Sequence, residues 1–479
     1  MSEAAGLERR LGAAASVAAS REALAAETAA WIVGGAVRDA ALGEGVGHAD
    51  LAVAPGAERE AARAIAHPRG GVAFPLSEHH PGWRAQAEDW HVDVTPLRAE
   101  TIEQDLRARD FSVNAIAVPL HGGDPIDPTG GLSDAGARRL RAVSDAAFEQ
   151  DPLRLLRAPR LAAAHDLEIE PGTMKLARAE AGRATRAAGE RQFAELRSML
   201  GGPAPLRALE LMDELGLTAV VLPELEATRG VAQNPNHHLD VHGHTLEVLA
   251  EWLRLESDPE GLAPGLGESI SEFLDEPLAD EMTRGHALRF GALFHDLGKP
   301  ETRGERDGYV TFLGHDEVGA EIIAGICERL RTSRLLSSHL QGLARHHLRL
   351  GFLIWERPLS RRAAYDYLRA TEPVSADVTL LSAADRLAAR GSGPIASEEM
   401  VDAHMALARE MLVDALEWHR DPPRPPLDGD ELAAELGIEP GPALGEILEE
   451  LRAASYAGEL PDRAAAVALA RDLAEDKGA

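Results

Sequence analysis

The sequence has one cysteine, no long apolar run, and far fewer basic than acidic residues. Cys327 alone cannot build a disulfide framework within the chain. No stretch approaches the roughly 18 consecutive apolar residues that a membrane-spanning helix needs. The first ten residues carry acidic side chains where a signal peptide requires bases and an apolar segment. These absences predict a cytoplasmic protein that makes no use of a membrane.

Basic residues are fewer than acidic residues, and both are unevenly distributed along the chain. With 49 Lys and Arg against 79 Asp and Glu, the net charge of −30 excludes a uniformly basic surface coated in nucleic acid. Leu255–Thr283 contains nine acidic and no basic residues, together with several prolines, and this composition predicts a solvated loop or insertion. Residues 136–197 contain twelve basic and nine acidic residues, so a phosphate-bearing partner is expected to bind there.

The length of 479 residues predicts two to four domains. Short β-branched segments beginning at Trp31, Asp50 and His91 predict strands, whereas helical spacing dominates after about Asp145. The proline-rich segment 421–426 predicts a linker before a last helical unit. The expected fold class is therefore α+β, with a small mixed-sheet head followed by a long helical body.

A glycine turn in the head has the features of a phosphate-binding site. The strand Trp31–Val33 leads into Gly34 and Gly35, and the helix expected from Ala36 directs its positive N-terminal end at the same point. Arg38 lies in the first turn of this helix. Gly43 is suited to end it in the left-handed conformation. A simple tight strand-to-helix turn is the alternative interpretation.

Two short strands place polar side chains on shared faces. Alternation puts His48 and Asp50 on one face of the first strand, and it puts His91, Asp93 and Thr95 on one face of the second. Acids that meet from adjacent strands beside a phosphate site suit metal-dependent phosphoryl or nucleotidyl transfer. The candidate pair is Asp50 and Asp93, with His48 as a third ligand. Salt-bridged surface acids are the alternative.

Five ordered motifs, beginning at Gly34, His48, Arg109, Asp127 and Asp151, resemble the bacterial CCA-adding tRNA nucleotidyltransferase and poly(A) polymerase family. The resemblance covers nearly the whole chain. It implies a nucleotidyltransferase head at 1–135, a helical neck at 136–230, a further helical body at 231–420 and a helical tail at 421–479. It also implies a tRNA or other RNA 3′ end as partner, ATP and CTP as substrates, and Mg²⁺ or Mn²⁺ in the head.

The resemblance assigns functional roles to particular residues. In the family the glycine turn holds the nucleoside triphosphate and the acidic strand holds catalytic metal ions, while later motifs contact the ribose and triphosphate and read the nucleobase. The matching positions here are Gly34, Gly35, Asp50, Arg109, Asp110, Asn114, Asp151 and Arg154. Asp151 and Arg154, three apart on an expected helix, would present an acceptor and a donor fork on one face that Arg157 continues. Without the surrounding motif, these two residues would be interpreted as a surface ion pair.

The chain departs from the family pattern at several positions. The family's Asp-x-Asp is His48-Ala-Asp50 here, and an imidazole is a poor replacement for a carboxylate at a magnesium site. Either His48 supports a softer metal such as manganese, or polymerisation is impaired. Gln150 and Ala108 replace the usual Glu and Arg, and Pro159 is expected to interrupt the neck helix.

The helical body contains a second ordered series of ligand-type residues. An adjacent His and Asp, joined by a distant His and a distant Asp, make a mixed nitrogen and oxygen site for a divalent metal, which activates water for attack on a phosphoester. The series resembles the HD metal-dependent phosphohydrolase domain, whose signature is matched by His244, His295, Asp296 and Asp385. His315 and His346 resemble the extra ligands of dinuclear versions, and Lys299 could hold a substrate phosphate as a catalytic residue. The neighbouring His237, His238 and His242 leave the identity of the first ligand open.

Three hypotheses follow from these motifs. The first is a template-independent RNA nucleotidyltransferase that adds CMP and AMP, or AMP alone, to RNA 3′ ends and carries an HD phosphohydrolase. The second keeps only the HD phosphohydrolase active, with Mg²⁺ or a divalent transition metal, while a head impaired by His48 binds nucleotide or RNA. The third is an RNA-binding scaffold with both sites idle, and the complete HD series disfavours it.

Overall fold

The computed structural model describes residues 3–76 and 81–477. The chain divides into two compact units, Met1–Val221 and Leu222–Ala479, which we describe separately. No helix in the described part of the chain is long and apolar enough to cross a membrane.

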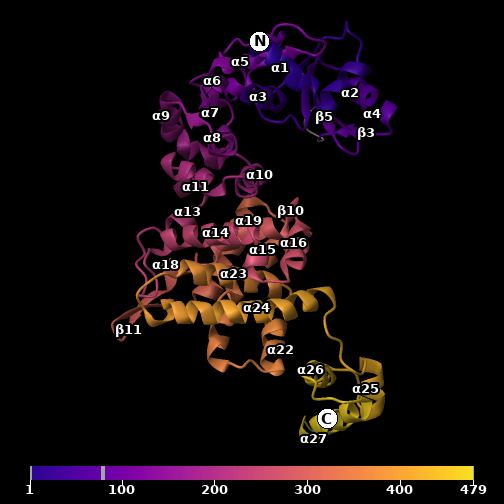
Figure 1. The fold of residues 1–479 in the computed structure, drawn as a ribbon, viewed down its shortest axis with the longest axis vertical. Helices are drawn as coiled ribbons and strands as arrows, with labels where there is room; N and C mark the ends of the chain where they lie inside the picture. Colours follow the sequence, from indigo (N-terminus) through magenta and orange to yellow (C-terminus); the bar gives the residue numbers. More distant parts are fainter. Residues whose placement is uncertain (1–2, 77–80, 478–479) are drawn as a thin grey trace. The chain divides into compact units, whose positions relative to one another are not determined.

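The first unit contains a mixed sheet with helices on its faces, followed by short helices (Figure 1). Its strands are β1 (Ala30–Val33), β2 (Ala49–Val53), β3 (Val72–Pro75), β4 (Trp83–Gln86), β5 (His91–Pro96), β6 (Ala117–Pro119), β7 (Arg139–Leu140) and β8 (Glu168–Ile169). Its helices are α1 (Glu3–Gly12), α2 (Ala15–Ala23), α3 (Gly35–Leu42), α4 (Glu58–Ala66), α5 (Ile102–Arg107), α6 (Gly131–Gly136), α7 (Ala147–Gln150), α8 (Arg154–Ala164), α9 (Pro171–Glu180), α10 (Gly189–Leu200), α11 (Pro205–Glu214) and α12 (Thr218–Val221).

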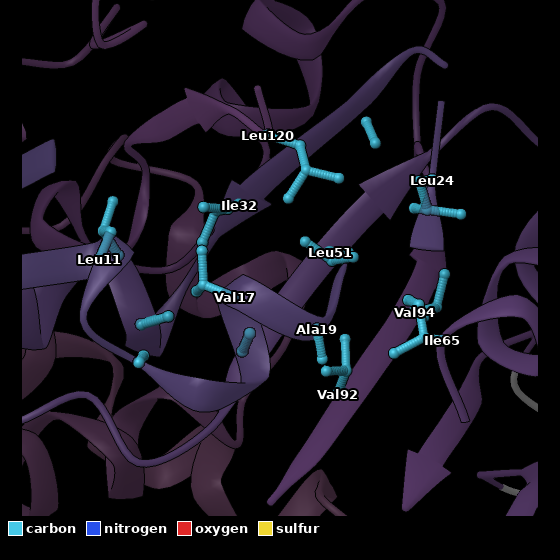
Figure 2. Packing of buried hydrophobic residues seen from close by; sticks show 14 of the residues in the cluster. Leu11, Val17, Ala19, Leu24, Ile32, Leu51, Ile65, Val92, Val94 and Leu120 are labelled. Carbon is cyan, nitrogen blue, oxygen red and sulfur yellow. The ribbon is translucent and has the colours of Figure 1, made fainter. Parts of the chain in front are cut away.

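The six-stranded sheet has the order β3-β4-β5-β2-β1-β6, and its central pair, β2 and β5, is parallel. Alternation along the strands sends Leu51, Val92 and Val94 into a core with Val17 of α2 and Ile65 of α4 (Figure 2). Burial of each such side chain stabilises the fold by about 1.5–3 kcal/mol. On the opposite face, α5 packs against Val33 and Ala52. Asp50 of β2 and Thr95 of β5 line a cavity on that face. The three strands expected at Trp31, Asp50 and His91 are confirmed as β1, β2 and β5.

The second unit is mainly helical (Figure 1). Its main helices are α14 (Val241–Ser257), α17 (Arg284–Phe294), α19 (His315–Leu330), α20 (Arg334–His346), α22 (Arg361–Ala370), α23 (Ser375–Ala388) and α24 (Glu398–Arg420). Shorter elements are α13 (Pro223–Glu226), α15 (Pro259–Leu262), α16 (Gly267–Asp275), α18 (Lys299–Thr302), α21 (Arg349–Phe352), and the hairpins β9 (Pro277–Ala279) with β10 (Met282–Thr283) and β11 (Arg303–Arg306) with β12 (Tyr309–Phe312). The helical periodicity gave no indication of these hairpins.

The prediction of a solvated loop at Leu255–Thr283 is wrong. The segment forms α15, α16, β9 and β10, and it buries Leu262, Ile270, Phe273 and Met282. Its acidic residues occupy the outer side of an amphipathic helix and its connections, so a count of charges could not reveal the apolar side.

The prediction that Pro159 interrupts its helix is also wrong, because α8 continues through it to Ala164. Proline removes one N–H from the helical ladder, but the buried Leu155, Leu156 and Leu161 hold the helix in place by packing. The predicted linker at 421–426 is confirmed as a segment without helix or strand. It precedes α25 (Gly429–Leu436), α26 (Pro442–Tyr456) and α27 (Arg463–Lys477), which share a small core of their own.

One glycine of the first unit allows a close backbone contact that supports the site described below. The Asp127 carboxylate accepts hydrogen bonds from the N–H groups of Gly131, at 2.7 Å, and Leu132, at 2.9 Å. A Cβ atom on Gly131 would lie 2.1 Å from the backbone oxygen of Ser112. Gly131 therefore allows α6 to pack directly against the turn Ser112–Asn114.

We expect Gly131→Ala to lower the free energy of unfolding by about 2 kcal/mol, because a backbone carbonyl has to move. The matched control is Gly45→Ala, where a Cβ meets no atom within 4 Å and the expected change stays below about 0.5 kcal/mol. Denaturant unfolding followed by circular dichroism measures both. Equal stability of the two variants would contradict the close approach at Gly131.

Candidate active site and candidate metal centre

A cavity of about 320 Å³ opens on the accessible face of the head sheet. The sequence-predicted residues that line it are Gly34, Gly35, Arg38, Asp50, Arg109, Asp110, Asn114, Asp151, Arg154 and Arg157. The sheet, the turn after α5 and the start of α8 thus bring the motifs of the head and neck to one place. Val33, Thr95, Arg98 and Arg191 also line the cavity, and the sequence analysis did not identify them as site residues.

The glycine turn brings Asp50 against the start of α3. Gly34 has φ = +66°, and a Cβ there would lie 2.9 Å from Oδ2 of Asp50 and 3.4 Å from Nη1 of Arg109. The N–H of Gly35 donates to Oδ2 of Asp50 at 3.2 Å. Only glycine permits both this conformation and this approach. The expected end of α3 is confirmed at Gly43, which has φ = +83°.

Asp50 is the carboxylate around which the cavity is arranged. Burial and, next, the neighbouring Asp93 carboxylate raise the pKa of Asp50, whereas the Gly35 N–H and the nearby Arg109 and Arg38 act in the opposite direction. Asp50 and Asp93 are direct register partners on β2 and β5. Burial and Asp93 thus disfavour the ionised form of Asp50. A cation bound beside the carboxylate would stabilise that form, so Asp50 is well suited to bind one.

Asp93, unlike Asp50, is held in an ion pair outside the cavity. Its two carboxylate oxygens accept hydrogen bonds from Nε and Nη2 of Arg84 on β4, at 2.7 and 2.8 Å, and it is not among the residues that line the cavity. His48 is exposed, and its ring stacks on that of His91 with centroids 3.6 Å apart. In the described part of the chain, no group of three potential ligands gathers in this cavity. The residues present therefore suit one cation at Asp50, and they do not form a two-carboxylate site.

The segment Arg109–Asn114, which follows α5, is organised by charge-assisted hydrogen bonds. Asp110 accepts from Nε of Arg157 at 2.7 Å and from Nδ2 of Asn114 at 3.1 Å, and Arg38 donates to Oδ1 of Asn114 at 3.0 Å. Burial favours the protonated acid, but Arg157 together with the hydrogen bonds from the Phe111 N–H and Asn114 outweighs it and holds the pKa of Asp110 below its usual value. Arg109 is held by Asp105 through an ion pair of 3.0 Å. These contacts fix the cationic side chains in orientation before any ligand binds.

The placement of Asp151 on a helix face with Arg154 is wrong, although both residues line the cavity. Asp151 is an extended residue in the turn between α7 and α8, and α8 begins at Arg154. Oδ2 of Asp151 lies 2.9 Å from Nη2 of Arg191 on α10. The separation of 40 residues gives no sequence signal for this pair.

A second cavity, of about 340 Å³, lies in the helical unit and is lined by ligand-type residues. Three imidazoles share one hydrogen-bond pattern there: Nδ1 of His295, His315 and His347 faces the carbonyl oxygen three residues earlier, at 2.9, 2.6 and 2.6 Å. Donation from Nδ1 leaves the lone pair of Nε2 free, which is the arrangement that metal-binding histidines adopt.

Six side chains complete two groups of potential ligands. His244, His295 and Asp385 form one group, and Asp296, His315 and His347 form the other, with the ligand atoms of each within 4.8 Å of one another. Nε2 of His315 and Nε2 of His347 face each other at 3.3 Å, and burial lowers the pKa of His347 to about 3. Neutral imidazoles converging with buried carboxylates fit divalent metal ions. A third group, Asp39, Glu44 and His165, is satisfied by its own ion pairs and those of Arg38.

The predicted ligand His346 faces away from the candidate centre, and the neighbouring His347 lies among the potential ligands instead. Helix α20 ends at His346, whose Nδ1 accepts a hydrogen bond from Arg349 at 3.0 Å on the outer side. His347 is only 2% exposed. One residue rotates a side chain by about 100° around a helix, so a His-His pair could not be assigned without the packing.

The remaining predicted residues of this centre are placed as follows. Nε2 of His244 lies 3.0 Å from Oδ1 of Asp385, which accepts the hydrogen bond, so His244 is the member of the histidine cluster paired with the second carboxylate. His242 lies apart from the centre, beside Thr228, whereas His237 lines the cavity and contacts the ring of His244. Nζ of Lys299 lies 2.6 Å from Asp296 and donates to Gln233 at 2.7 Å, so it faces the same cavity.

Comparison with known proteins gives matches along most of the chain. Residues 30–141 match the poly A polymerase head domain, 166–228 the probable RNA and SrmB-binding site of polymerase A, and 265–390 the HD domain. An A-adding tRNA nucleotidyltransferase of Deinococcus radiodurans is 36% identical over 93% of this chain and 96% of its own length. A CC-adding tRNA nucleotidyltransferase of Thermus thermophilus is 33% identical over 90% of each chain.

Solved structures share the fold. A CCA-adding enzyme in complex with ATP superposes with a TM-score of 0.59 at 21% identity, covering 92% of this chain and 90% of the other. The Thermotoga maritima CCA-adding enzyme complexed with tRNA superposes with a TM-score of 0.54 at 20% identity, covering 94% and 92%.

The contrast between His346 and His347 generates a prediction about metal content. We expect His347→Ala to lose about half of the bound divalent metal, whereas the matched control His346→Ala keeps the wild-type content. Apo-protein reloaded with Co²⁺, followed by its visible spectrum and by elemental analysis, measures both. The reverse order of the two variants would contradict the assignment.

The same centre predicts a pH dependence of metal affinity. Burial opposes protonation of His295, but the Asp296 carboxylate outweighs it and raises the pKa of His295 in the metal-free protein. A proton therefore competes with metal for Nε2, and Co²⁺ affinity should rise with pH through the neutral range. Affinity that is flat across this range in the wild type would argue against His295 as a ligand.

Proposed function

Because this chain belongs to the family of CCA-adding tRNA nucleotidyltransferases and poly(A) polymerases, we propose that it adds nucleotides to the 3′ ends of tRNA without a template, using CTP, ATP or both. It is a nucleotidyltransferase with an appended HD domain. Its partners are tRNA and nucleoside triphosphates. We propose that it acts on tRNA in the cytoplasm.

The observation that carries this proposal is the composition of the head cavity. Six arginines and three aspartates line it, beside a glycine turn and the N-terminal end of α3. The arginines, backbone N–H groups and helix end together suit a triphosphate. The negative net charge of the chain is thus no obstacle to nucleotide binding, because the cationic residues are concentrated where the phosphates would lie.

The residues that line the cavity have different roles in the proposed reaction. Arg38 and Arg109 bind and orient the triphosphate, and Asp151 with Arg154 faces the nucleobase. Asp50 would hold the divalent cation, Mg²⁺ or Mn²⁺, which when bound neutralises charge on the attacking and leaving oxygens. Asp50 lies beside the glycine turn, so a cation held there would be next to the N–H groups that suit a phosphate.

His48 remains the departure that bears on activity. Its exposed ring stacks on His91, and Asp93 is engaged by Arg84, so Asp50 is the carboxylate available to a cation. We propose that Asp50 alone holds the cation, Mg²⁺ or Mn²⁺, because no histidine among the described residues lines the cavity. The alternative, a head that only binds nucleotide or RNA, predicts no incorporation with either metal.

The decisive assay offers the protein three transcripts of one tRNA: without its CCA end, ending in C, and ending in CC. Each is incubated with labelled CTP or ATP and with Mg²⁺ or Mn²⁺. We expect incorporation into at least one transcript, and the transcript that is extended identifies CC, A or full CCA addition.

Asp50→Asn should reduce incorporation by at least about a hundredfold, whereas the exposed control Asp89→Asn should not. His48→Asp should raise incorporation with Mg²⁺.

Absence of incorporation by the wild type into every transcript with both metals would overturn the transferase proposal. Equal loss in Asp50→Asn and Asp89→Asn would instead show that the loss reflects folding and that Asp50 is not the functional carboxylate. No gain in His48→Asp would mean that His48 is not a defect.

We also propose that the HD centre hydrolyses phosphoesters, with Mg²⁺ or a divalent transition metal. The observation that favours it is the shared orientation of His295, His315 and His347, whose Nε2 atoms lie 3.2, 3.3 and 3.7 Å from the Asp296 carboxylate. Metal bound there would activate water, and Lys299 would neutralise a substrate phosphate. Asp296 and Asp385 supply the anionic charge that retains the metal.

Hydrolysis of p-nitrophenyl phosphate and of 2′,3′-cyclic AMP tests this second activity. We expect His347→Ala and Asp385→Ala to lose at least about tenfold in rate while His346→Ala and nucleotide addition stay unchanged. Hydrolysis by the wild type that is insensitive to His347→Ala would place the activity elsewhere. Loss of nucleotide addition in Asp385→Ala would contradict the independence of the two sites.

A further inference from the structure

We propose that Arg191 of α10 is a specificity-determining residue of the nucleotidyltransferase, which positions the Asp151 carboxylate to accept a hydrogen bond from the nucleobase amino group. The proposal rests on the proposed function of the head cavity. Arg191 acts through Asp151 and is therefore a positioning residue. It selects CTP and ATP, which carry an amino group at cytosine C4 or adenine C6, over UTP and GTP, which carry a carbonyl at that position.

Asp151 is held at both oxygens. Oδ1 accepts the backbone N–H of Leu153 at 3.2 Å, and Oδ2 accepts from Nη2 of Arg191 at 2.9 Å. Both Asp151 and Arg191 line the cavity. Each carboxylate oxygen has two lone pairs, so one acceptor site on each oxygen stays available to a ligand in the cavity. With two fixed contacts, the plane of the carboxylate is set before the nucleotide arrives.

Arg154 cannot perform this task. Its Nη1 donates to the backbone oxygens of Arg109 and Ala147, at 3.2 and 3.3 Å, and its Nη2 donates to that of Ala108 at 2.8 Å. Arg154 is 9% exposed and ties α8 to the segment after α5. The two residues assigned to base reading are thus not paired with each other, and the partner of the acceptor comes from a different helix.

Helix α10 is fixed against α8 by a second contact one turn along. Glu195 lies 2.5 Å from Nε of Arg160 and 3.8 Å from Nη1 of Arg157. Residues 191 and 195 lie on one face of the helix, so α10 presents a positive and a negative side chain to the same region. Glu195 sets the position of the helix, and Arg191 transmits this position to Asp151.

The exposure of the Arg191 pair argues for a role in binding over a role in stability. The Arg191 side chain is 51% exposed, and ion pairs at such positions contribute little to the free energy of unfolding. Orientation of a carboxylate, by contrast, decides which bases can donate to it. Cytosine N4 and adenine N6 are donors, whereas uracil O4 and guanine O6 are acceptors that the carboxylate repels.

The test measures kcat/KM for CTP, ATP, UTP and GTP on the tRNA transcript that the wild type extends. We expect Arg191→Ala to lower the ratio of amino-bearing to carbonyl-bearing nucleotides by about tenfold, with the melting temperature unchanged. Arg191→Lys keeps the charge and should recover part of the ratio. The matched control is Arg197→Ala, on the same helix and outside the cavity, which should keep the wild-type ratio.

A double-mutant cycle decides whether Arg191 acts through Asp151. In an Asp151→Asn background, Arg191→Ala should change the ratio no further. If turnover of Asp151→Asn is too low, calorimetric Kd values for CTP and UTP replace kcat/KM. An unchanged ratio in Arg191→Ala, or an equal loss for all four nucleotides, would overturn the inference. An unchanged ratio in Asp151→Asn would instead overturn base reading by Asp151 in the proposed function. This outcome distinguishes a failure of the proposed function from a failure of the inference about Arg191.

Discussion

The close approach between Asp50 and the turn at Gly34 and Gly35 is the constraint on which the nucleotidyltransferase head depends. A side chain at Gly34 would occupy the space of the Asp50 carboxylate, and the Gly35 N–H donates directly to that carboxylate. The turn thus brings together the anion that can hold a cation and the helix end that can hold a phosphate. Sheet order reinforces this arrangement, because β2 lies between β1, which leads into the turn, and β5.

Charged side chains around Asp50 are held in ion pairs with one another. Arg84 engages Asp93, Arg157 engages Asp110, Asp105 engages Arg109, and Arg191 engages Asp151. Each pair holds a long side chain in one orientation, and this preorganisation lowers the cost of ordering the site when nucleotide binds. It also explains how a chain with a net charge of −30 can present an arginine-rich cavity. The acidic excess resides elsewhere, including helices such as α16.

The HD centre shows a different principle, in which backbone carbonyls orient the ligands. His295, His315 and His347 each lie at the end or the beginning of a helix, where a carbonyl three residues earlier can accept from Nδ1. The helix ends thereby direct three Nε2 atoms toward Asp296. Each of these hydrogen bonds spans only three residues. All the potential ligands of the HD centre therefore come from the second unit and are oriented by its own backbone.

Sequence patterns predicted the local elements well and the long-range pairings poorly. The glycine turn, the strands β1, β2 and β5, and nine of the residues around Asp50 were recognisable because strand alternation and motif spacing are short-range properties. The apolar side of α16 was hidden by its acidic residues, and the continuation of α8 through Pro159 depended on packing that no local rule contains.

The sequence by itself determined which residue types meet a phosphate and a metal, since glycine, arginine, aspartate and histidine carry that chemistry wherever they lie. Only the tertiary structure decided that Asp93 pairs with Arg84, that His347 replaces His346, and that Arg191 reaches Asp151. The physical reason is the same in all three cases. Which side chain faces a site depends on how a helix or strand is rotated against its neighbours, and that rotation is set by packing between segments far apart in the chain.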